Sequence, residues 1–374
     1  MIATPFRLPA TAAVLAVCLA SVAHAQRPSV PDPDDFEIVV DLERLPVISQ
    51  DSTGTCWSFA TTSFLESEVK RLSGEQIDLS EMFLVRWAYM EKAERYVRLH
   101  GKTQFSQGGL SHDVIAMARR YGIVPAADFD GLAGNATRHD HGELEKTLKA
   151  MLEVYAPASS PSPYWQDAIG GVLDAYLGEV PEVIEVEGRK MTPQQYAAEV
   201  LRLPLDDYVE IMSLQSEGFG RRSELLVPDN WMRDANYWNV PVDDLLANLD
   251  HALEHGYTVA IDCDVSEPTN DNRRGVYQLS PALERRSITD ELRQQQFDSR
   301  ETTDDHLMHI VGIAKADDGR TFYITKNSWG RRGPFEGNLM LSRNYVALKT
   351  LALMVHVDGL TSAVRERFGR PAGQ

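Results

Sequence analysis

The spacing of apolar residues predicts a helical first part of the chain. Apolar positions recur at helical spacing over residues 56–72 and again over 111–121, and glycines lie at the end of both stretches. Between them, Asp78 and Glu81 have the spacing of a capping box, which predicts that a second helix opens there and runs toward Arg98. Together these segments predict a lobe built of helices.

The middle of the chain, residues 129–240, has a different pattern. It holds amphipathic stretches separated by joints rich in proline and glycine: HGELEKTLKAMLEVY, YWQDAIGGVLDAYLG and TPQQYAAEVLRL. We interpret this region as an inserted helical subdomain. A further helix is predicted over 241–255, because four leucines share one face and a glycine follows: Leu245, Leu246, Leu249, Leu253 and Gly256.

After that helix the apolar period changes to two, which is the period of strands. The stretch YTVAIDCDV, residues 257–265, predicts a buried strand. Residues 306–315 and 321–327 predict a hairpin that turns at Asp-Asp-Gly, residues 317–319. The last part of the chain is therefore predicted to be largely β.

These patterns predict an α+β fold in which a groove separates a helical lobe from a β-rich lobe. The predicted parts are a helical lobe at 26–128, the inserted subdomain at 129–240, the β-rich lobe at 241–360 and a tail at 361–374. With 374 residues, 43% hydrophobic and 25% charged, the chain has the composition of a globular protein with a large core. The formal net charge of −18 argues against nucleic acid and anionic membranes as partners.

The first 25 residues have the pattern of a secretory signal. Arg7 precedes an apolar stretch over residues 10–22, and Ala-His-Ala at 23–25 provides a cleavage site before Gln26. The rival is a membrane anchor, but the stretch is shorter than the roughly 20 residues that a spanning helix needs. We therefore expect an exported protein, periplasmic or secreted, with no membrane attachment after cleavage. Cleavage would leave a net charge of −19, which is −18 minus the single positive charge removed.

Export would leave two cysteines, Cys56 and Cys263, which could pair because disulfides form outside the cytoplasm. Such a disulfide would add little to so large a core, and Cys56 has an unusual context. It stands at the start of a predicted helix, where the helix dipole favours a thiolate, and Gly54 allows close approach of the backbone. The Cys56 N–H and the Gln50 amide are candidate donors to an oxyanion. A single cysteine at a helix start is nevertheless more often a packing residue.

A nucleophilic cysteine needs a base, and the predicted hairpin provides two candidates. Folding it about residue 318 places Asn327 opposite position 309, within about one residue, and position 306 lies farther along the same edge. His306 and His309 differ by an odd number and so face opposite sides of the strand. Only one of them can reach the groove, and the spacing alone does not say which.

Several separated motifs resemble those of the papain-like cysteine peptidases. QDSTGTCWSF at 50–59 resembles the family's cysteine helix, HLMHIVGI at 306–313 its histidine strand and KNSWG at 326–330 its asparagine motif. In that family the catalytic histidine precedes a glycine by six residues, which selects His306, six before Gly312.

The resemblance implies a role for each matched residue. Cys56 would be the nucleophile, paired with His306 as thiolate and imidazolium, and Asn327 would orient the histidine. Gln50 and the Cys56 N–H would form the oxyanion hole, and Trp329 would shield the His–Asn hydrogen bond. The matching Gly-Gly of the family lines the substrate backbone and corresponds to Gly108 and Gly109.

The departures from the papain pattern indicate a branch. Cys56 and His306 lie 250 positions apart, against roughly 130–150 in papain-like enzymes, and the excess is the helical insertion. This insertion and the segment CDVSE at 263–267 resemble the bleomycin hydrolase and aminopeptidase C branch, especially its exported bacterial members. That branch implies a thiol aminopeptidase, often a homo-hexamer with active sites facing an inner cavity. It also implies a C-terminal arm in the cleft, but the tail here is short and basic.

The leading hypothesis is therefore a cysteine aminopeptidase that cleaves peptides through a thioester and needs no cofactor. The alternatives are a papain-like endopeptidase, an acyltransferase with the same thioester chemistry, and a catalytically silent peptide-binding protein. The silent reading is disfavoured because all four matched polar residues are present: Gln50, Cys56, His306 and Asn327.

Other polar residues receive more ordinary interpretations. Cys263 is expected to be a packing residue, whose neighbours Asp262 and Asp264 border the cleft or hold a substrate amine. The Asp304-Asp305 pair is expected to be a solvated loop. The histidines at 112, 251 and 255 do not form a metal set, so no metal site is expected.

Overall fold

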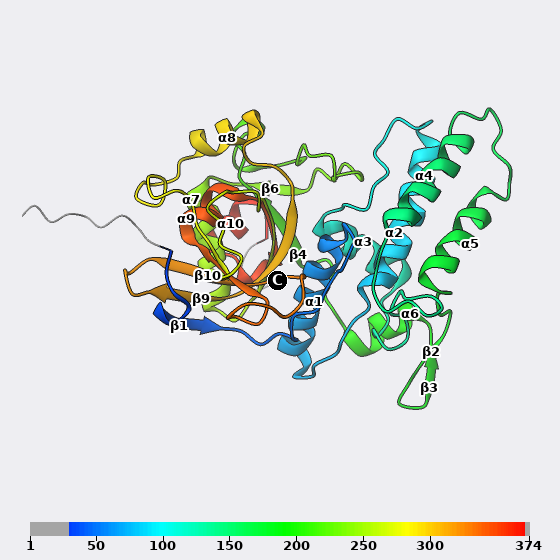
Figure 1. Ribbon diagram of the computed structural model, residues 1–374, viewed down its shortest axis with the longest axis horizontal. Coiled ribbons are helices and arrows are strands. Elements are labelled where there is room, and N and C mark those ends of the chain that lie inside the picture. The colour runs from blue at the N-terminus through cyan, green and yellow to red at the C-terminus, as the bar shows by residue number, and fades with distance from the viewer. Residues whose placement is uncertain (1–29, 371–374) are drawn as a thin grey trace, which may run out of the picture.

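The computed structural model describes residues 30–370 (Figure 1). The predicted signal at 1–25, its cleavage site and residues 371–374 of the tail lie outside the described residues. None of the described helices has the length and hydropathy needed to cross a membrane.

The helical lobe consists of α1 (Cys56–Ser73), α2 (Glu81–Arg98) and α3 (Ser111–Tyr121), close to the predicted ranges. The N-cap of α2 is Ser80 and not Asp78, so the capping-box prediction is wrong. The Ser80 hydroxyl accepts a hydrogen bond from the Phe83 N–H at 3.0 Å. Serine and aspartate are both good N-caps, and only the backbone decides which one stands in the extended conformation before the first turn.

The helices of the inserted region pack beside α2, at the right of Figure 1. Its elements are α4 (Gly142–Tyr155), α5 (Trp165–Leu177), the hairpin of β2 (Ile184–Val186) and β3 (Arg189–Met191), α6 (Pro193–Gln195) and a π-helix, η2 (Tyr196–Leu201). The first two amphipathic stretches fold as α4 and α5 and bury apolar residues at four-residue spacing, and the third folds as α6 and η2. In α4 these are Leu144, Leu148 and Leu152.

Residues 208–239 depart from the helical interpretation of the middle region. They supply β4 (Tyr208–Met212), β5 (Arg221–Ser223) and β6 (Tyr237–Asn239), which belong to the main sheet. β4 pairs antiparallel with β12 (Thr350–His356), more than 130 positions later in the chain. These short strands were missed because a strand of three to five residues shows little periodicity and its partner lies far away in the sequence.

Ten strands of the described chain form the main sheet, in the order β5-β6-β4-β12-β7-β9-β10-β11-β8, with β1 paired to β9. The remaining strands are β1 (Phe36–Asp41), β7 (Val259–Cys263), β8 (Val276–Tyr277), β9 (His306–Ala316), β10 (Thr321–Lys326) and β11 (Asn338–Ser342). The predicted buried strand corresponds to β7, and the predicted hairpin corresponds to β9 and β10.

Further helices accompany the sheet. They are α7 (Val242–Glu254), α8 (Asp290–Ser299), α9 (Arg343–Lys349) and α10 (Ser362–Arg367), with three short 3-10 helices: η1 (Pro33–Asp35), η3 (Gln215–Glu217) and η4 (Val357–Gly359). All four leucines on the predicted face of α7 are buried, and they pack in a core with α9 and one face of the sheet.

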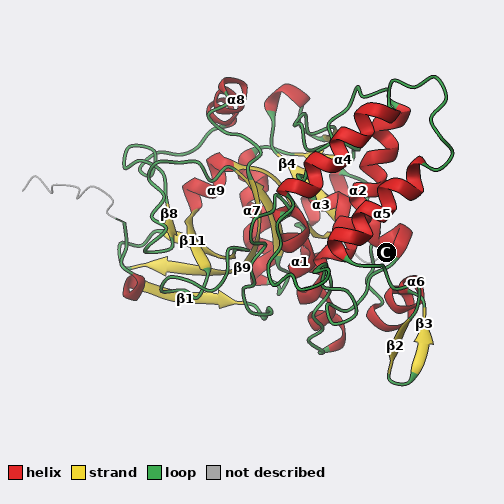
Figure 2. Ribbon diagram, turned by 45° about the vertical axis from the view of Figure 1, so that its right-hand side comes forward, coloured by secondary structure: helices red, strands yellow, loops and turns green. Residues whose placement is uncertain are grey.

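α1 lies between the other helices of the helical lobe and the sheet, as Figures 1 and 2 show together. Its side chains are buried along most of its length, and it contacts β9 and β7. Two polar contacts cross this interface. The Ser63 hydroxyl lies 3.0 Å from His309 Nδ1, and the Lys326 ammonium lies 3.9 Å from the Glu66 carboxylate. The packing holds the first turn of α1 against the ends of β9 and β10, and the two-lobe α+β prediction is confirmed.

Candidate active site

Cys56 is the first residue of α1 and lines an open cavity of about 510 Å³. The other walls come from three separated segments: the loop before α3, the loop that contains Asp229, and the start of β9. Because the first backbone N–H groups of a helix have no partner within it, the first turn of α1 can offer donors beside the sulfur. The structure thus places the predicted nucleophile in a solvent-accessible hollow.

His306 lies in the wall of the same cavity, at the first position of β9. Its Nε2 lies 2.7 Å from Asn327 Oδ1, and the same Oδ1 accepts the Ser328 N–H at 2.7 Å. An amide oxygen only accepts hydrogen bonds, so His306 Nε2 carries the hydrogen and Nδ1 is left unprotonated in the neutral ring. That free nitrogen is the position from which a base would act.

The structure also separates the two candidate histidines. His309 is completely buried and its Nδ1 contacts the Ser63 hydroxyl, on the α1 side of the sheet. Lys326 pairs with His309 across the hairpin, so Asn327 lies one residue past that pair, inside the predicted uncertainty. A register irregularity between Ile324 and Thr325 is what brings Asn327 to the His306 ring.

Trp329 stacks on the His306 ring, with ring centroids 4.7 Å apart and planes 29° from parallel. His306 and Asn327 each expose only 4% of their surface. The indole therefore covers one face of the imidazole and helps to keep water from the His–Asn hydrogen bond, the arrangement that the resemblance implies.

Gln50 also faces the cavity, and its amide is fixed from both ends. Its Nε2 donates to the Thr53 carbonyl at 2.7 Å, and its Oε1 accepts from the Ser328 hydroxyl at 2.6 Å. An amide NH₂ has two hydrogens, so one N–H remains for a ligand in the cavity. Gln50 is thereby preorganised as a donor beside Cys56.

Gly108 and Gly109 line the cavity with backbone alone. A Cβ on Gly108 would lie 1.9 Å from an oxygen of Asp229, and one on Gly109 would lie 2.5 Å from an oxygen of Asp113. No side chain fits at either position, so the main chain stays open to an extended ligand. The loop is tied to α1, because the Trp57 indole donates to the Gln107 carbonyl at 2.9 Å.

The environment opposes charge on both reacting groups. Burial, reinforced by the negative charges of Asp304, Asp262 and Asp229, raises the pKa of the Cys56 thiol to about 12. Burial lowers the pKa of His306 to about 4, against the opposing effect of the Asn327 hydrogen bond. These effects oppose the helix dipole, which favours a thiolate at the start of α1. An ion pair must rest on the mutual attraction of thiolate and imidazolium.

Four acidic residues line the cavity: Glu145, Asp229, Asp304 and Asp305. The Asp304-Asp305 pair is therefore part of the site wall, not only a solvated loop. Sequence reasoning missed Glu145 and Asp229, which arrive from segments without a motif, and only the fold brings them to Cys56. Asp264, in contrast, accepts from Ser266 and Thr303 and lies 3.7 Å from the Lys349 ammonium.

Cys263 is buried on β7, and both described cysteines are free, so the alternative of a Cys56–Cys263 disulfide is not formed. The described part of the tail also stays out of the cavity lining. Phe368 stacks on Trp238 at 4.6 Å, and the Arg370 guanidinium contacts Asp207 at 3.1 Å. Through Phe368 and Arg370, the described part of the tail therefore packs against the main sheet near β6 and β4.

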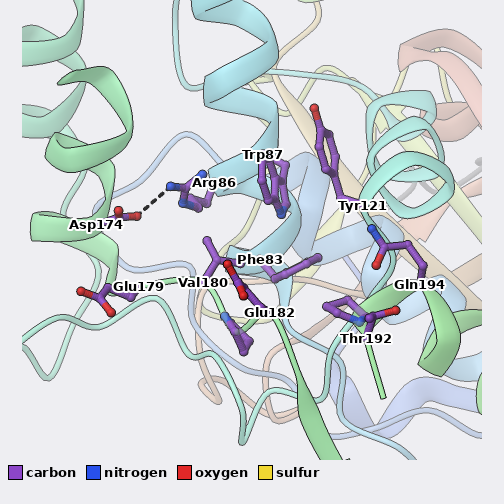
Figure 3. Close-up of a pocket in the computed structure, with 12 residues that line it drawn as sticks. Phe83, Arg86, Trp87, Tyr121, Asp174, Glu179, Val180, Glu182, Thr192 and Gln194 are labelled. Atoms are coloured by element: carbon purple, nitrogen blue, oxygen red, sulfur yellow. Dashed lines mark hydrogen bonds and ion pairs between the residues drawn. The ribbon is translucent and has the colours of Figure 1, made fainter. Parts of the chain in front are cut away.

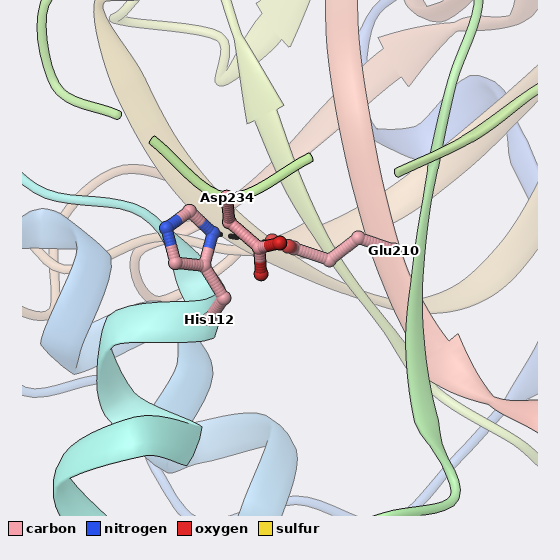
Figure 4. A group of neighbouring side chains, drawn as sticks. All are labelled: His112, Glu210 and Asp234. Atoms are coloured by element: carbon pink, nitrogen blue, oxygen red, sulfur yellow. Dashed lines mark hydrogen bonds and ion pairs between the residues drawn. The ribbon is translucent and has the colours of Figure 1, made fainter. Parts of the chain in front are cut away.

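A second polar cluster combines His112 of α3 with Glu210 of β4 and Asp234, whose ligand-type atoms lie within 4.8 Å of one another (Figure 4). Burial opposes charge on His112, but Glu210 at 3.0 Å and Asp113 at 3.4 Å raise its pKa to about 9. A metal ion would have to displace the proton that these carboxylates hold on His112, and the cluster as it stands fits a buried ion-pair network. His251 and His255 stack on each other elsewhere, at the end of α7.

Another cavity, of about 520 Å³, lies between α2, α3 and the inserted region (Figure 3). Trp87 and Tyr121 stack in its wall at 3.9 Å, and the Arg86 guanidinium contacts Asp174 at 2.7 Å. Its lining shares no residue with the cavity of Cys56, and it contains no nucleophile with a neighbouring base.

Comparison with known proteins agrees with this geometry. Aminopeptidase C of Lactococcus lactis subsp. lactis is 22% identical over 365 residues, covering 87% of this chain and 84% of that protein. Aminopeptidase G of Lactobacillus delbrueckii subsp. lactis is 21% identical over 364 residues, covering 86% and 83%. The crystal structure of PepW from Lactobacillus rhamnosis HN001 has the same fold, with a TM-score of 0.72 and 18% sequence identity over 89% of this chain and 84% of its own. Residues 185–372, half of the chain, match the model of the Peptidase C1-like family, and the chain belongs to that family.

Proposed function

We propose that this protein is a cysteine aminopeptidase that releases N-terminal residues from peptides through a thioester intermediate. The observation that carries the proposal is the shared cavity of Cys56 and His306, in which His306 is held through its far nitrogen by Asn327. Relatives over most of the chain are named aminopeptidases C and G, which supports the exopeptidase reading.

The mechanism begins with proton transfer. Because each charged form is disfavoured alone, we expect the Cys56 proton to move to His306 Nδ1 as the sulfur attacks the scissile carbonyl carbon. The carbon–nitrogen bond then breaks, and the imidazolium returns that proton to the leaving amine. A water molecule next gives a proton to His306 and attacks the thioester. The carbon–sulfur bond breaks, the carboxylic acid leaves, and the thiol is restored.

The tetrahedral intermediates of both halves carry a negative oxygen, for which the site has fixed donors. The free N–H of Gln50 and the backbone N–H of Cys56 are the proposed pair. Since Gln50 is already held by Thr53 and Ser328, it needs no reorganisation when the negative charge develops.

We also propose that the protein is exported and that it assembles as a homo-hexamer. The N-terminal pattern supports export to the periplasm or the medium, and the resemblance supports a homo-hexamer. Light scattering of the purified mature chain would measure the assembly, and a monomer would contradict the hexamer.

The test uses purified mature protein and its Cys56→Ala variant. Fluorogenic aminoacyl amides and the same amides with an acetylated amine report peptidase activity on free and blocked ends. We expect hydrolysis of the free-amine substrates and none by Cys56→Ala. Unchanged activity of Cys56→Ala would refute the mechanism, and absence of hydrolysis by the wild type would favour an acyltransferase or a silent binding protein.

A further inference from the structure

The wall of the Cys56 cavity is strongly acidic. Its lining includes four carboxylates and neither lysine nor arginine: Glu145, Asp229, Asp304 and Asp305. Three of these have donors within the chain. Glu145 accepts from the Gln107 amide at 2.8 Å, Asp229 from the Gln104 amide at 2.6 Å, and Asp305 from the Thr303 hydroxyl at 2.7 Å. Among the described residues, no amide, hydroxyl or backbone N–H group donates to Asp304, whose hydrogen-bond neighbour is instead the Asp262 carboxyl group.

Asp304 faces a second carboxyl group, that of Asp262 on β7. Asp262 exposes 3% of its surface, no N–H or hydroxyl group of the described chain donates to either of its oxygens, and its hydrogen bond is with the Asp304 carboxyl group. Burial and the charge of Asp304 raise the pKa of Asp262, and burial and the charge of Asp229 raise the pKa of Asp304 to about 7. The two carboxyl groups can share one proton, which leaves one negative charge on the pair, and the cavity lining has no lysine or arginine to balance it. A positive group in the cavity would therefore complete this part of the wall.

Lys92 does not supply that positive group to Asp304. Its ammonium is buried behind the Gly108 loop and donates to the carbonyls of Ser106 and Gly108. It attracts Asp229 and Asp113, and it is not among the main charges that act on Asp304. The positive charge of Lys92 thus partly compensates Asp229, whereas Asp304 remains available to bind a ligand.

The acidic wall lies next to the reacting atoms. The charges of Asp304, Asp262 and Asp229 all act on the Cys56 sulfur. Asp229 also presses against the Gly108 backbone, where a Cβ would lie 1.9 Å from its carboxylate. A peptide whose first carbonyl reaches Cys56 therefore places its α-ammonium group, two bonds from that carbonyl carbon, near these carboxylates.

We propose that Asp304, with Asp229 beside it in the wall and Asp262 buried behind it, binds the α-ammonium group of the substrate and so selects peptides with a free N-terminus. The inference rests on the proposed peptidase function and names the residues that give it exopeptidase character. An ammonium has three N–H donors and one positive charge, and it matches the carboxylate acceptors of this part of the wall. An acetylated amine has neither the charge nor the donors.

The test compares Asp304→Asn with wild type on alanyl and leucyl fluorogenic amides, each with a free and an acetylated amine. Asparagine keeps the shape and removes the charge. We expect kcat/KM for the free-amine substrates to fall by about 10-fold to 100-fold, the range of a lost charge-assisted hydrogen bond, while kcat/KM for the acetylated substrates changes by less than about twofold. Asp317→Asn, which removes the same charge from the exposed hairpin turn, should leave both unchanged.

Several outcomes would overturn this inference while leaving the peptidase function intact. In each, Cys56→Ala is inactive, so the nucleophile stands. Equal hydrolysis of free and acetylated amides by the wild type would show that the amine is not recognised. Equal losses on both substrate types in Asp304→Asn would assign a structural role. Preferred cleavage of acetylated dipeptide amides with lysine or arginine as their first residue would show that the wall binds a side chain instead. If Asp304→Asn is insoluble, Asp229→Asn gives the same comparison with a smaller expected loss.

Discussion

Removing the Asn327 carboxamide tests the central contact of the site. In Asn327→Ala, the Nε2–H of a histidine that exposes 4% of its surface loses its acceptor. Leaving such a buried donor unpaired costs about 1–3 kcal/mol, and the ring is no longer held through its Nε2. At 1.4 kcal/mol for each factor of ten, we expect kcat/KM to fall by about 10-fold to 100-fold.

The assay is the initial rate on a fluorogenic aminoacyl amide from about pH 2.5 to pH 9, a range that brackets the His306 pKa of about 4. The Asn327 hydrogen bond opposes the burial that lowers the pKa of His306, so its loss lowers that pKa further. The acid limb of the kcat/KM profile should therefore move to lower pH. Asn344→Ala is the control, because Asn344 donates to carbonyls of a loop on the β-rich lobe and does not line the cavity.

A loss below about twofold, with an unchanged acid limb, would refute the assignment of Asn327 as the group that orients His306. A loss of activity no larger than the fraction of protein that is unfolded at the assay temperature would also count against it, because the side chain would then act on folding alone. Far-UV circular dichroism and the melting temperature of each variant distinguish these results.

Three further predictions concern the oxyanion donor Gln50, the N-cap of α2 and the buried His112. Gln50→Ala should lower kcat by about 10²–10³ with little change in stability, measured by steady-state kinetics, and wild-type kcat would contradict its role as oxyanion donor. Ser80→Ala should lower the free energy of unfolding, measured in urea, by about 1 kcal/mol, and Asp78→Ala should lower it by less. A larger loss in Asp78→Ala would indicate that Asp78 caps α2. The stabilisation by His112 should be full below pH 6.5 and lost as the pH rises to about 9, because its folded pKa is raised. Thermal unfolding should therefore show that the free energy of unfolding differs by about 3 kcal/mol between wild type and His112→Gln at low pH, and that this difference shrinks between pH 6.5 and about 9. A metal chelator should leave the difference unchanged.

The sequence carried enough information to predict the family and the fold class. The papain-like motifs lie at the ends of elements whose periodicity is strong, and the predicted relation to the aminopeptidase C branch is confirmed by relatives that cover most of the chain. The structure brings the residues named from those motifs into one site, with Cys56 and His306 in the cavity and Asn327 and Trp329 against the His306 ring. Their catalytic roles remain predictions that the variants above test.

Where sequence reasoning failed, the missing information was nonlocal. The helical interpretation of residues 129–240 missed the strands at 208–239, because the partner of β4 is β12, which lies far away in the sequence. Ser80, not Asp78, is the N-cap of α2. Both residue types are good N-caps, so the sequence did not distinguish them, and the backbone conformation decides which of them precedes the first turn. Asp304 was expected in solvent, yet it lines the cavity of Cys56.

The sequence by itself determined which elements form and which residue types are available for chemistry, because helix caps, turns and apolar periods are local properties of the chain. Only the tertiary structure decided which charges meet. Asp229, Asp262 and Asp304 come from three distant segments, and their convergence beside Cys56 raises the thiol pKa and leaves an acidic wall without a cation. Electrostatic interactions act through space and depend on burial, so no spacing along the chain could have predicted them.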